Sequence, residues 1–293
     1  MKNNMTTPPS RESLRRHAHS LSALGIILAL TCALLTGCGQ LQSANPITDV
    51  HSLEGRRIGV GLAWGPDYIM SERDDVNTVR YNSVSNAVTA LCYRQVDAVA
   101  VEKPLAIDIV NIVPGLRYIS EPVAMDTFGY ILPLDSVDLE AEIDAFIKEF
   151  SRTPAYEDLV ARINDPAGYT YQNVPLNGGE RVLHVGAVAD TYPFSYQNAA
   201  TDAMEGSDVE FLCHFANAYG YELVFESVTW ESMEFGIQYG QYDVGCGGVS
   251  ESFRPDLELS GTARMTDSFM PIDIVLVVID ETNNQESTAA SGQ

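Results

Sequence analysis

The chain has 293 residues, 45% of them hydrophobic, which is enough to bury a core in one large domain or in two smaller ones. Its formal net charge is −23 at pH 7. Because binding to nucleic-acid phosphates needs a basic face, this charge excludes a nucleic-acid partner and indicates a solvated acidic surface.

Residues 1–37 have the parts of an export signal. Three arginines within residues 11–16 precede an apolar run from Leu21 to Leu35, which is too short and wrongly flanked for a permanent membrane span. The next residues, Leu35-Thr36-Gly37-Cys38, resemble a bacterial lipobox, in which Cys38 is acylated, for example with palmitate, and becomes the first mature residue. An ordinary signal or membrane anchor that happens to contain a cysteine is the alternative. Acylation would anchor the protein on the extracytoplasmic face of the cell membrane.

The first half of the mature chain has the pattern of an α/β domain. Residues 38–46 are predicted to be a disordered tether. Strands are expected at residues 57–62, 78–82 and 97–101, and a helix at residues 83–94. The run Asp97–Val101 is typical of a parallel strand covered on both faces. Glu102 follows it directly, and ligands of open α/β sheets collect at the carboxyl ends of strands, so Glu102 is expected to face a cleft. Capping the helix that starts at Pro104 is its alternative role.

The middle of the chain is predicted to hold a strand, two helices and a linker. The strand is expected at residues 128–132, and the helices at 139–150 and 153–163. Residues 164–181 are rich in proline and glycine, which is typical of a linker.

A candidate binding site lies between Val182 and Val278. A strand runs into the aromatic turn Tyr192-Pro193-Phe194, and Ser207–Glu210 is expected to be a capping box that opens a helix. Trp230 follows a second strand. The segment Tyr242–Arg254 then combines paired glycines, hydroxyl groups and one arginine. Glycines let backbone N–H groups approach a ligand, and a guanidinium matches the two oxygens of a carboxylate, so this segment predicts an anion site.

Together these motifs resemble the first lobe of the family 3 extracellular solute-binding proteins, the polar amino-acid receptors of ABC importers. Residues 53–60 and 96–104 resemble the second lobe of that family. The resemblance implies an α/β, two-lobed periplasmic-binding-protein-like (type II) fold, in which each lobe is a mainly parallel sheet flanked by helices. Lobe 2 would occupy residues 47–128 and lobe 1 residues 182–280, with residues 129–163 forming a return strand and helices that pack on lobe 1. Residues 281–293 would be a disordered tail.

This order is reversed relative to the family, so we expect a circularly permuted chain. Its new ends would lie in the loop that joins the outgoing crossover strand to lobe 2, because surface loops tolerate such cuts. One of two covalent connections between the lobes would then be cut, and the strand near Ile274 would dock without it. A dimer in which two chains exchange lobes is the alternative.

The resemblance also implies roles for site residues. Arg254 would hold a ligand carboxylate, assisted by Gly248, Ser250 and Ser252, and Glu102 would accept the ligand's ammonium group. The ligand side chain would be enclosed by Tyr192, Phe194 and Trp230. Trp64 stands where the family has a threonine and would close the pocket as an apolar wall. The alternatives are a surface ion pair for Arg254 and plain core positions for the aromatic residues.

Three cysteines remain after residue 38, namely Cys92, Cys213 and Cys246. Their spacing fits no metal site, and we expect buried thiols, with a Cys213–Cys246 disulfide as the alternative. No cofactor and no catalytic motif are predicted.

The expected function is therefore capture of a small zwitterionic ligand, an amino acid or a derivative, for the membrane subunits of an ABC importer. A ligand-sensing lipoprotein, or a dehydratase or lyase on the same fold, are the alternatives.

Overall fold

The computed structural model describes residues 46–281. Residues 47–281 belong to one compact unit. The predicted signal peptide, Cys38, the tether up to residue 45 and the tail from residue 282 lie outside the described residues. Among the helices of the described part, none is long and apolar enough to cross a membrane.

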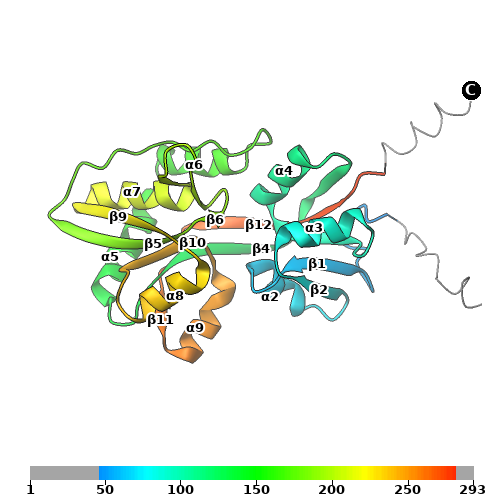
Figure 1. Ribbon diagram of the computed structural model, residues 1–293, viewed down its shortest axis with the longest axis horizontal. Helices are drawn as coiled ribbons and strands as arrows, with labels where there is room; N and C mark the ends of the chain where they lie inside the picture. The colour runs from blue at the N-terminus through cyan, green and yellow to red at the C-terminus, as the bar shows by residue number, and fades with distance from the viewer. Residues whose placement is uncertain (1–45, 282–293) are drawn as a thin grey trace, which may run out of the picture. The chain divides into compact units, whose positions relative to one another are not determined.

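The described unit has a mixed α/β fold around one sheet of nine strands, and two lobes share that sheet (Figure 1). The strand order is β2-β1-β3-β12-β4-β10-β5-β9, with β11 paired to β4. The strands β2, β1 and β3 are parallel and belong to lobe 2, whereas β10, β5 and β9 are parallel and belong to lobe 1. The predicted α/β class, with parallel strands flanked by helices, is confirmed.

Lobe 2 contains three strands and three helices. They are β1 (Arg57–Gly61), β2 (Asn77–Tyr81), β3 (Ala98–Glu102), α2 (Gly65–Ser71), α3 (Val84–Cys92) and α4 (Lys103–Ile112). The apolar run in β3 is buried on both faces: Val99 packs in a cluster with Leu91 of α3, and Ala100 packs in another with Met70 of α2. α3 begins where the Ser83 hydroxyl accepts a bond from Asn86 N at 3.2 Å.

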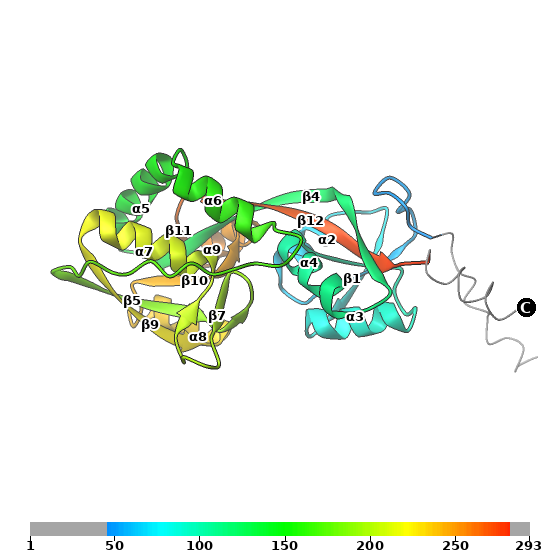
Figure 2. The ribbon, with the colours of Figure 1, turned by 90° about the horizontal axis from the view of Figure 1, so that it is seen from above.

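Two long antiparallel strands connect the lobes and lie side by side in both ribbon views (Figures 1 and 2). They are β4 (Leu116–Pro133) and β12 (Met270–Ile279). β12 pairs with β4 along most of its length and also with β3, where Ile274 lies opposite Glu102. β4 leads from lobe 2 to lobe 1, and β12 leads back and docks between β3 and β4. The described chain ends two residues after β12, so the cut expected in the connection beyond this strand stays a prediction.

The two ends of the described unit meet at Arg117. Its Nη2 donates to the carbonyl of Ile47 at 3.1 Å, and its backbone lies opposite Val278 in the β4–β12 register. Further along, Asp280 N donates to Gly115 O at 2.8 Å, and Glu281 forms an ion pair with Arg94. The chain therefore enters and leaves the unit at one place, on lobe 2.

Lobe 1 has its helices on both faces of the parallel strands. Its elements are α5 (Val137–Phe150), α6 (Pro154–Ile163), β5 (Arg181–Val188), α7 (Ser207–Tyr219), β9 (Tyr221–Val228), α8 (Trp230–Gln238), β10 (Val244–Ser250), the 3-10 turn η1 (Glu251–Phe253), α9 (Arg254–Ser260) and β11 (Ala263–Met265). A second sheet joins β6 (Asp190–Thr191), β7 (Ser195–Gln197) and β8 (Met204–Glu205). The core between α5 and α7 is aromatic, with Phe146 edge-on to Phe211 at 5.3 Å.

The capping box predicted at the start of α7 is wrong. Gly206 precedes the helix with a φ of 130°, and no side chain caps the first turn. The Glu210 carboxylate instead accepts bonds from Arg162, while the Asp208 carboxylate bonds to the β10 backbone.

The three described cysteines are free. Cys213 and Cys246 are buried as expected, and they are not joined by a disulfide. Cys92 is exposed, contrary to the expectation of a buried thiol, because it is the last residue of α3.

Candidate functional site

A cavity of about 790 Å³ lies where the two lobes face each other. Lobe 2 contributes the turn after β1 and Asn82, and lobe 1 contributes the ends of β5 and β9, the start of α8 and the β10–η1 segment. Its walls carry four large aromatic side chains, Trp64, Phe194, Trp230 and Phe253. The size and the apolar lining are those of a small-molecule site.

Asp67 holds the lobe 2 wall in place. Its carboxylate accepts bonds from Ala63 N at 3.0 Å, from Arg80 Nε at 2.7 Å and from Ser71 Oγ at 3.0 Å. Ala63 has a φ of 60°, which favours glycine, so these bonds stabilise a costly turn. The turn presents Trp64 to the cavity as α2 begins.

Two hydrogen bonds between residues three positions apart in the sequence help to place the aromatic residues of lobe 1. Phe194 N donates to Thr191 O at 2.8 Å, and the Phe194 ring packs edge-on against Phe128 at 4.8 Å. The Thr229 hydroxyl accepts from Ser232 N at 3.3 Å and caps α8, so Trp230 is the first helical residue. Phe194 thus lies in the turn between β6 and β7, and Trp230 lies at the start of α8.

The lobes touch beside the cavity through aromatic rings and a glycine. Phe253 lies edge-on to Tyr68 of α2 at 4.9 Å and packs against Trp230 at 5.2 Å. A Cβ atom at Gly65 would lie 2.6 Å from Asp126 Oδ2 and 2.9 Å from Ser250 Oγ, so only glycine allows this approach.

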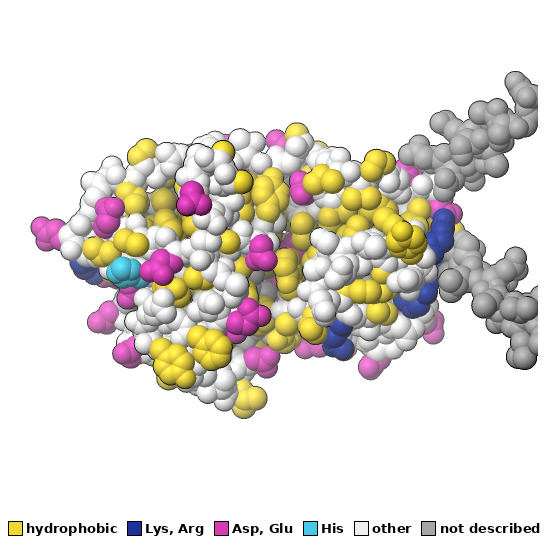
Figure 3. All heavy atoms as spheres, in the orientation of Figure 1, with side chains coloured by type: hydrophobic (Ala, Val, Ile, Leu, Met, Phe, Trp, Pro, Cys, Tyr) yellow, Lys and Arg dark blue, Asp and Glu magenta, His cyan; other side chains and the backbone are white. Residues whose placement is uncertain are grey.

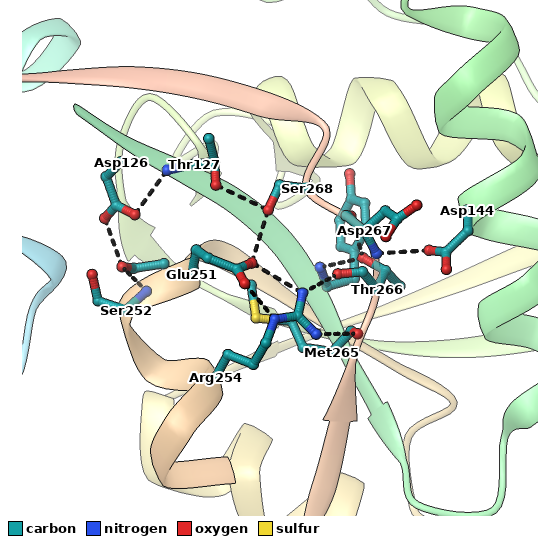
Figure 4. A network of polar contacts seen from close by, with 12 residues as sticks. Asp126, Thr127, Asp144, Glu251, Ser252, Arg254, Met265, Thr266, Asp267 and Ser268 are labelled. Atoms are coloured by element: carbon teal, nitrogen blue, oxygen red, sulfur yellow. Dashed lines mark hydrogen bonds and ion pairs between the residues drawn. The ribbon is translucent and has the colours of Figure 1, made fainter. Parts of the chain in front are cut away.

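Arg254 does not line the cavity. Its Nε and Nη2 donate to the two oxygens of Glu251, Nη1 donates to Met265 O at 2.9 Å, and Nη2 also donates to Thr266 O at 2.7 Å (Figure 4). The Glu251 carboxylate raises the pKa of Arg254. The guanidinium therefore ties the start of α9 to the segment that follows β11.

The paired glycines also have a partner within the chain. Gly247 N and Gly248 N both donate to Asp208 Oδ2, at 3.0 and 2.8 Å. Both glycines have positive φ values, 140° and 72°, where β10 departs from its register with β4. Burial raises the pKa of Asp208 to about 7, against the effect of these hydrogen bonds.

Glu102 lies at the end of β3 as expected, but it is 3% exposed and does not line the cavity. Its Oε2 has no hydrogen-bond partner among the described residues. Burial raises its pKa to about 7, and the nearby Asp126 carboxylate adds to the shift. Asp126 in turn accepts a 2.6 Å bond from Ser250 Oγ.

The structure brings some of the predicted site residues together and separates others. Trp64, Phe194, Trp230 and Gly248 line the cavity. Five others, Glu102, Tyr192, Ser250, Ser252 and Arg254, do not. The Tyr192 hydroxyl donates to Tyr169 O at 3.3 Å, and Ser252 N donates to Ser250 Oγ at 3.0 Å.

Sequence reasoning missed Phe253, Asp190 and Glu231, all of which line the cavity. Each stands next to, or within, a motif that was recognised: Phe253 precedes Arg254, Asp190 leads into the aromatic turn, and Glu231 follows Trp230. Within the described range, His, Cys, Asp and Glu side chains form no group of three or more that could hold a metal ion.

Residues 183–254 match the model of the bacterial extracellular solute-binding proteins, family 3. An L-cystine-binding protein, TcyA of Bacillus subtilis (strain 168), is 33% identical over 75 residues, which are 26% of this chain and 28% of TcyA. The chain thus matches little more than a quarter of the length of this relative.

Solved structures align with this chain at lower sequence identity. The ligand-binding component of an ABC-type import system from Staphylococcus aureus aligns with a TM-score of 0.44 and 12% identity, over 81% of this chain and 70% of that one. A probable amino-acid ABC transporter extracellular-binding protein from Bacillus subtilis aligns with a TM-score of 0.41 and 11% identity, over 82% and 94% of the two chains.

Proposed function

We propose that this chain is a family 3 bacterial extracellular solute-binding protein that captures a small amino-acid-like solute for an ABC importer. The match of residues 183–254 to the family model supports this proposal. The observation that carries the proposal is the cavity of about 790 Å³ with walls from both lobes. A ligand held by both walls has more contacts in the closed state than in an open one, so it selects closure, which membrane subunits can then detect.

The rings of Trp64 and Trp230 are proposed to bind the ligand from opposite lobes. Trp64 comes from the turn before α2, and Trp230 is the first residue of α8. The proposal that Arg254 and Glu102 hold the two charged ends of a zwitterion stays a prediction. It requires Glu251 to release the guanidinium when the ligand binds.

A ligand screen on the full mature chain tests the proposed function. We expect one of the standard amino acids, L-cystine or a related amine to raise the melting temperature, since a ligand at roughly 100 times its Kd adds about 2.7 kcal/mol of stability. Trp230→Ala should abolish the shift. Phe235→Ala is the matched control, because Phe235 lies on the same helix and is 60% exposed. A panel without any shift or heat of binding would reject the receptor function.

The reversed lobe order is proposed to be a circular permutation within one chain. The meeting of residues 47 and 278–281 at Arg117 supports it, because joining those ends would need only a short loop.

Lipid anchoring at Cys38 is proposed from the lipobox-like sequence alone. It would keep the receptor beside the importer on the extracytoplasmic face of the membrane. Intact-mass spectrometry of the native protein is the test: an acylated chain that begins at Cys38 is expected, and an unmodified Cys38 inside a longer chain rejects the anchor.

A further inference from the structure

The two groups that the sequence predicted to bind a ligand anion are already occupied by carboxylates of the chain. Arg254 is held by Glu251 on two nitrogens, and its remaining bonds go to two backbone carbonyls (Figure 4). The N–H groups of Gly247 and Gly248 are held by Asp208, which is fully buried. To bind either of these groups, a ligand carboxylate would have to displace its internal partner.

The charged residues that line the cavity are both acidic. Asp190 at the start of β6 and Glu231 in the first turn of α8 both line it and are exposed. No Lys, Arg or His is among its described lining residues. Within residues 46–281, neither carboxylate forms an ion pair with a side chain of the protein. Two negative charges therefore face the space that a ligand would fill.

The remaining walls suit a cation as well. Trp64, Trp230 and Phe253 present aromatic rings to the cavity, and the face of an aromatic ring attracts ammonium and guanidinium groups, most strongly in tryptophan. In the space-filling view, hydrophobic and acidic side chains lie along the boundary between the lobes, while most visible Lys and Arg side chains lie over lobe 2 (Figure 3). A net charge of −23 would also draw cations toward the protein.

From these three observations, and resting on the proposed receptor function, we propose that the ligand is an organic cation whose binding needs no carboxylate. Its ammonium or guanidinium group would lie against the rings of Trp64 and Trp230, within reach of Asp190 and Glu231. The carboxylates would supply charge and the rings would supply contact area, so the binding depends on ligand charge more than on an amino-acid backbone.

Calorimetry with four probes tests this inference on the full mature chain. Agmatine has the guanidinium of L-arginine without its carboxylate. L-citrulline keeps the α-carboxylate and α-ammonium groups but has a neutral side chain, and choline presents a quaternary ammonium. We expect agmatine or choline to bind at least as tightly as L-arginine, and L-citrulline to bind about tenfold more weakly or not at all. Raising the salt concentration should weaken binding of the cations.

Three variants distinguish the contribution of the cavity carboxylates to cation binding from that of the protein's overall negative charge. Asp190→Asn and Glu231→Gln should each weaken cation binding by about threefold or more, whereas Glu157→Gln, an exposed carboxylate of α6, should leave it unchanged. If only probes with a free carboxylate bind, and Arg254→Ala abolishes that binding, the inference is overturned while the receptor function stands. If neither the amino acids nor the cations bind, both fall.

Discussion

Glu251 binds Arg254 through both of its carboxylate oxygens. The two residues are three positions apart in the sequence, Glu251 at the start of η1 and Arg254 at the start of α9. The same guanidinium bonds to the carbonyls of Met265 and Thr266, so one side chain joins η1, α9 and the segment after β11. In the described structure Arg254 therefore holds α9 and the segment after β11 together and does not line the cavity.

Removing this guanidinium should destabilise the protein. Arg254→Ala is expected to lower the free energy of unfolding by about 2 kcal/mol, because charge-assisted bonds are lost and two carbonyls lose their donor. Chemical denaturation measures the change. Arg152→Ala is the control, since Arg152 is exposed between α5 and α6. Equal stability of the two variants would show that the Arg254 contacts contribute nothing.

Glu102 should make stability depend on pH. Burial raises its pKa from 4.5 to about 7, so the folded protein binds this proton more tightly than the unfolded chain does. The stability that Glu102 contributes is fully present below its unfolded pKa and is lost as the pH rises through about 7, by about 3 kcal/mol at most.

The variant Glu102→Gln isolates this effect. Its melting temperature should exceed that of the wild type at pH 8 and match it at pH 4.5, because glutamine carries no charge at either pH. Glu157→Gln, an exposed substitution, should leave the pH profile unchanged. Parallel profiles for wild type and Glu102→Gln would contradict the prediction.

The proximity of the two ends makes a relinked chain feasible. Residue 281 joined to residue 47 by a short Gly-Ser linker, with new ends opened within residues 173–177, should fold with a melting temperature close to that of the wild type. A second chain opened within α7, whose apolar face is buried, should fail to fold. Loss of folding in the first design would show that the two ends cannot be joined.

The cysteines should differ in reactivity. In the protein lacking residues 1–45, a thiol reagent should modify Cys92 at once, and Cys213 and Cys246 only after unfolding, because those two are buried. Burial also raises the pKa of the Cys213 thiol to about 12, which removes the reactive thiolate. Cys92→Ser should show no fast reaction, and a fast reaction that persists in this variant would contradict the assignment.

The sequence predicted those elements whose pattern is local. The apolar run of β3 and the periodic face of α7 are set by neighbouring residues, and both are present near the expected bounds. α2 was missed because it is seven residues long and opens with Gly65 and Pro66. β4 was seen only at its end, since its central residues lie in the crossing between lobes and are partly exposed.

The contacts of the candidate site were harder to predict because several of its groups bond to residues that are distant in the sequence. Nothing near Gly247 indicates that Asp208, 39 residues earlier, bonds to its N–H. The Glu251–Arg254 pair is different: a spacing of three residues is a recognised signal for a local ion pair, and it was available in the sequence. Trp230 was found because it follows a predicted strand, and Trp64 because it stands where the family that the sequence resembles has a threonine.

The placement of β12 between β3 and β4 imposes an order on biosynthesis. Lys103 and Asp273 form an ion pair across this junction although 170 residues separate them. In a nascent chain on the ribosome, the edges of β3 and β4 that face β12 therefore stay unpaired until this last described strand has been translated. Lobe 2, made first, is completed last, so truncated or stalled products should be the aggregation-prone species of this protein.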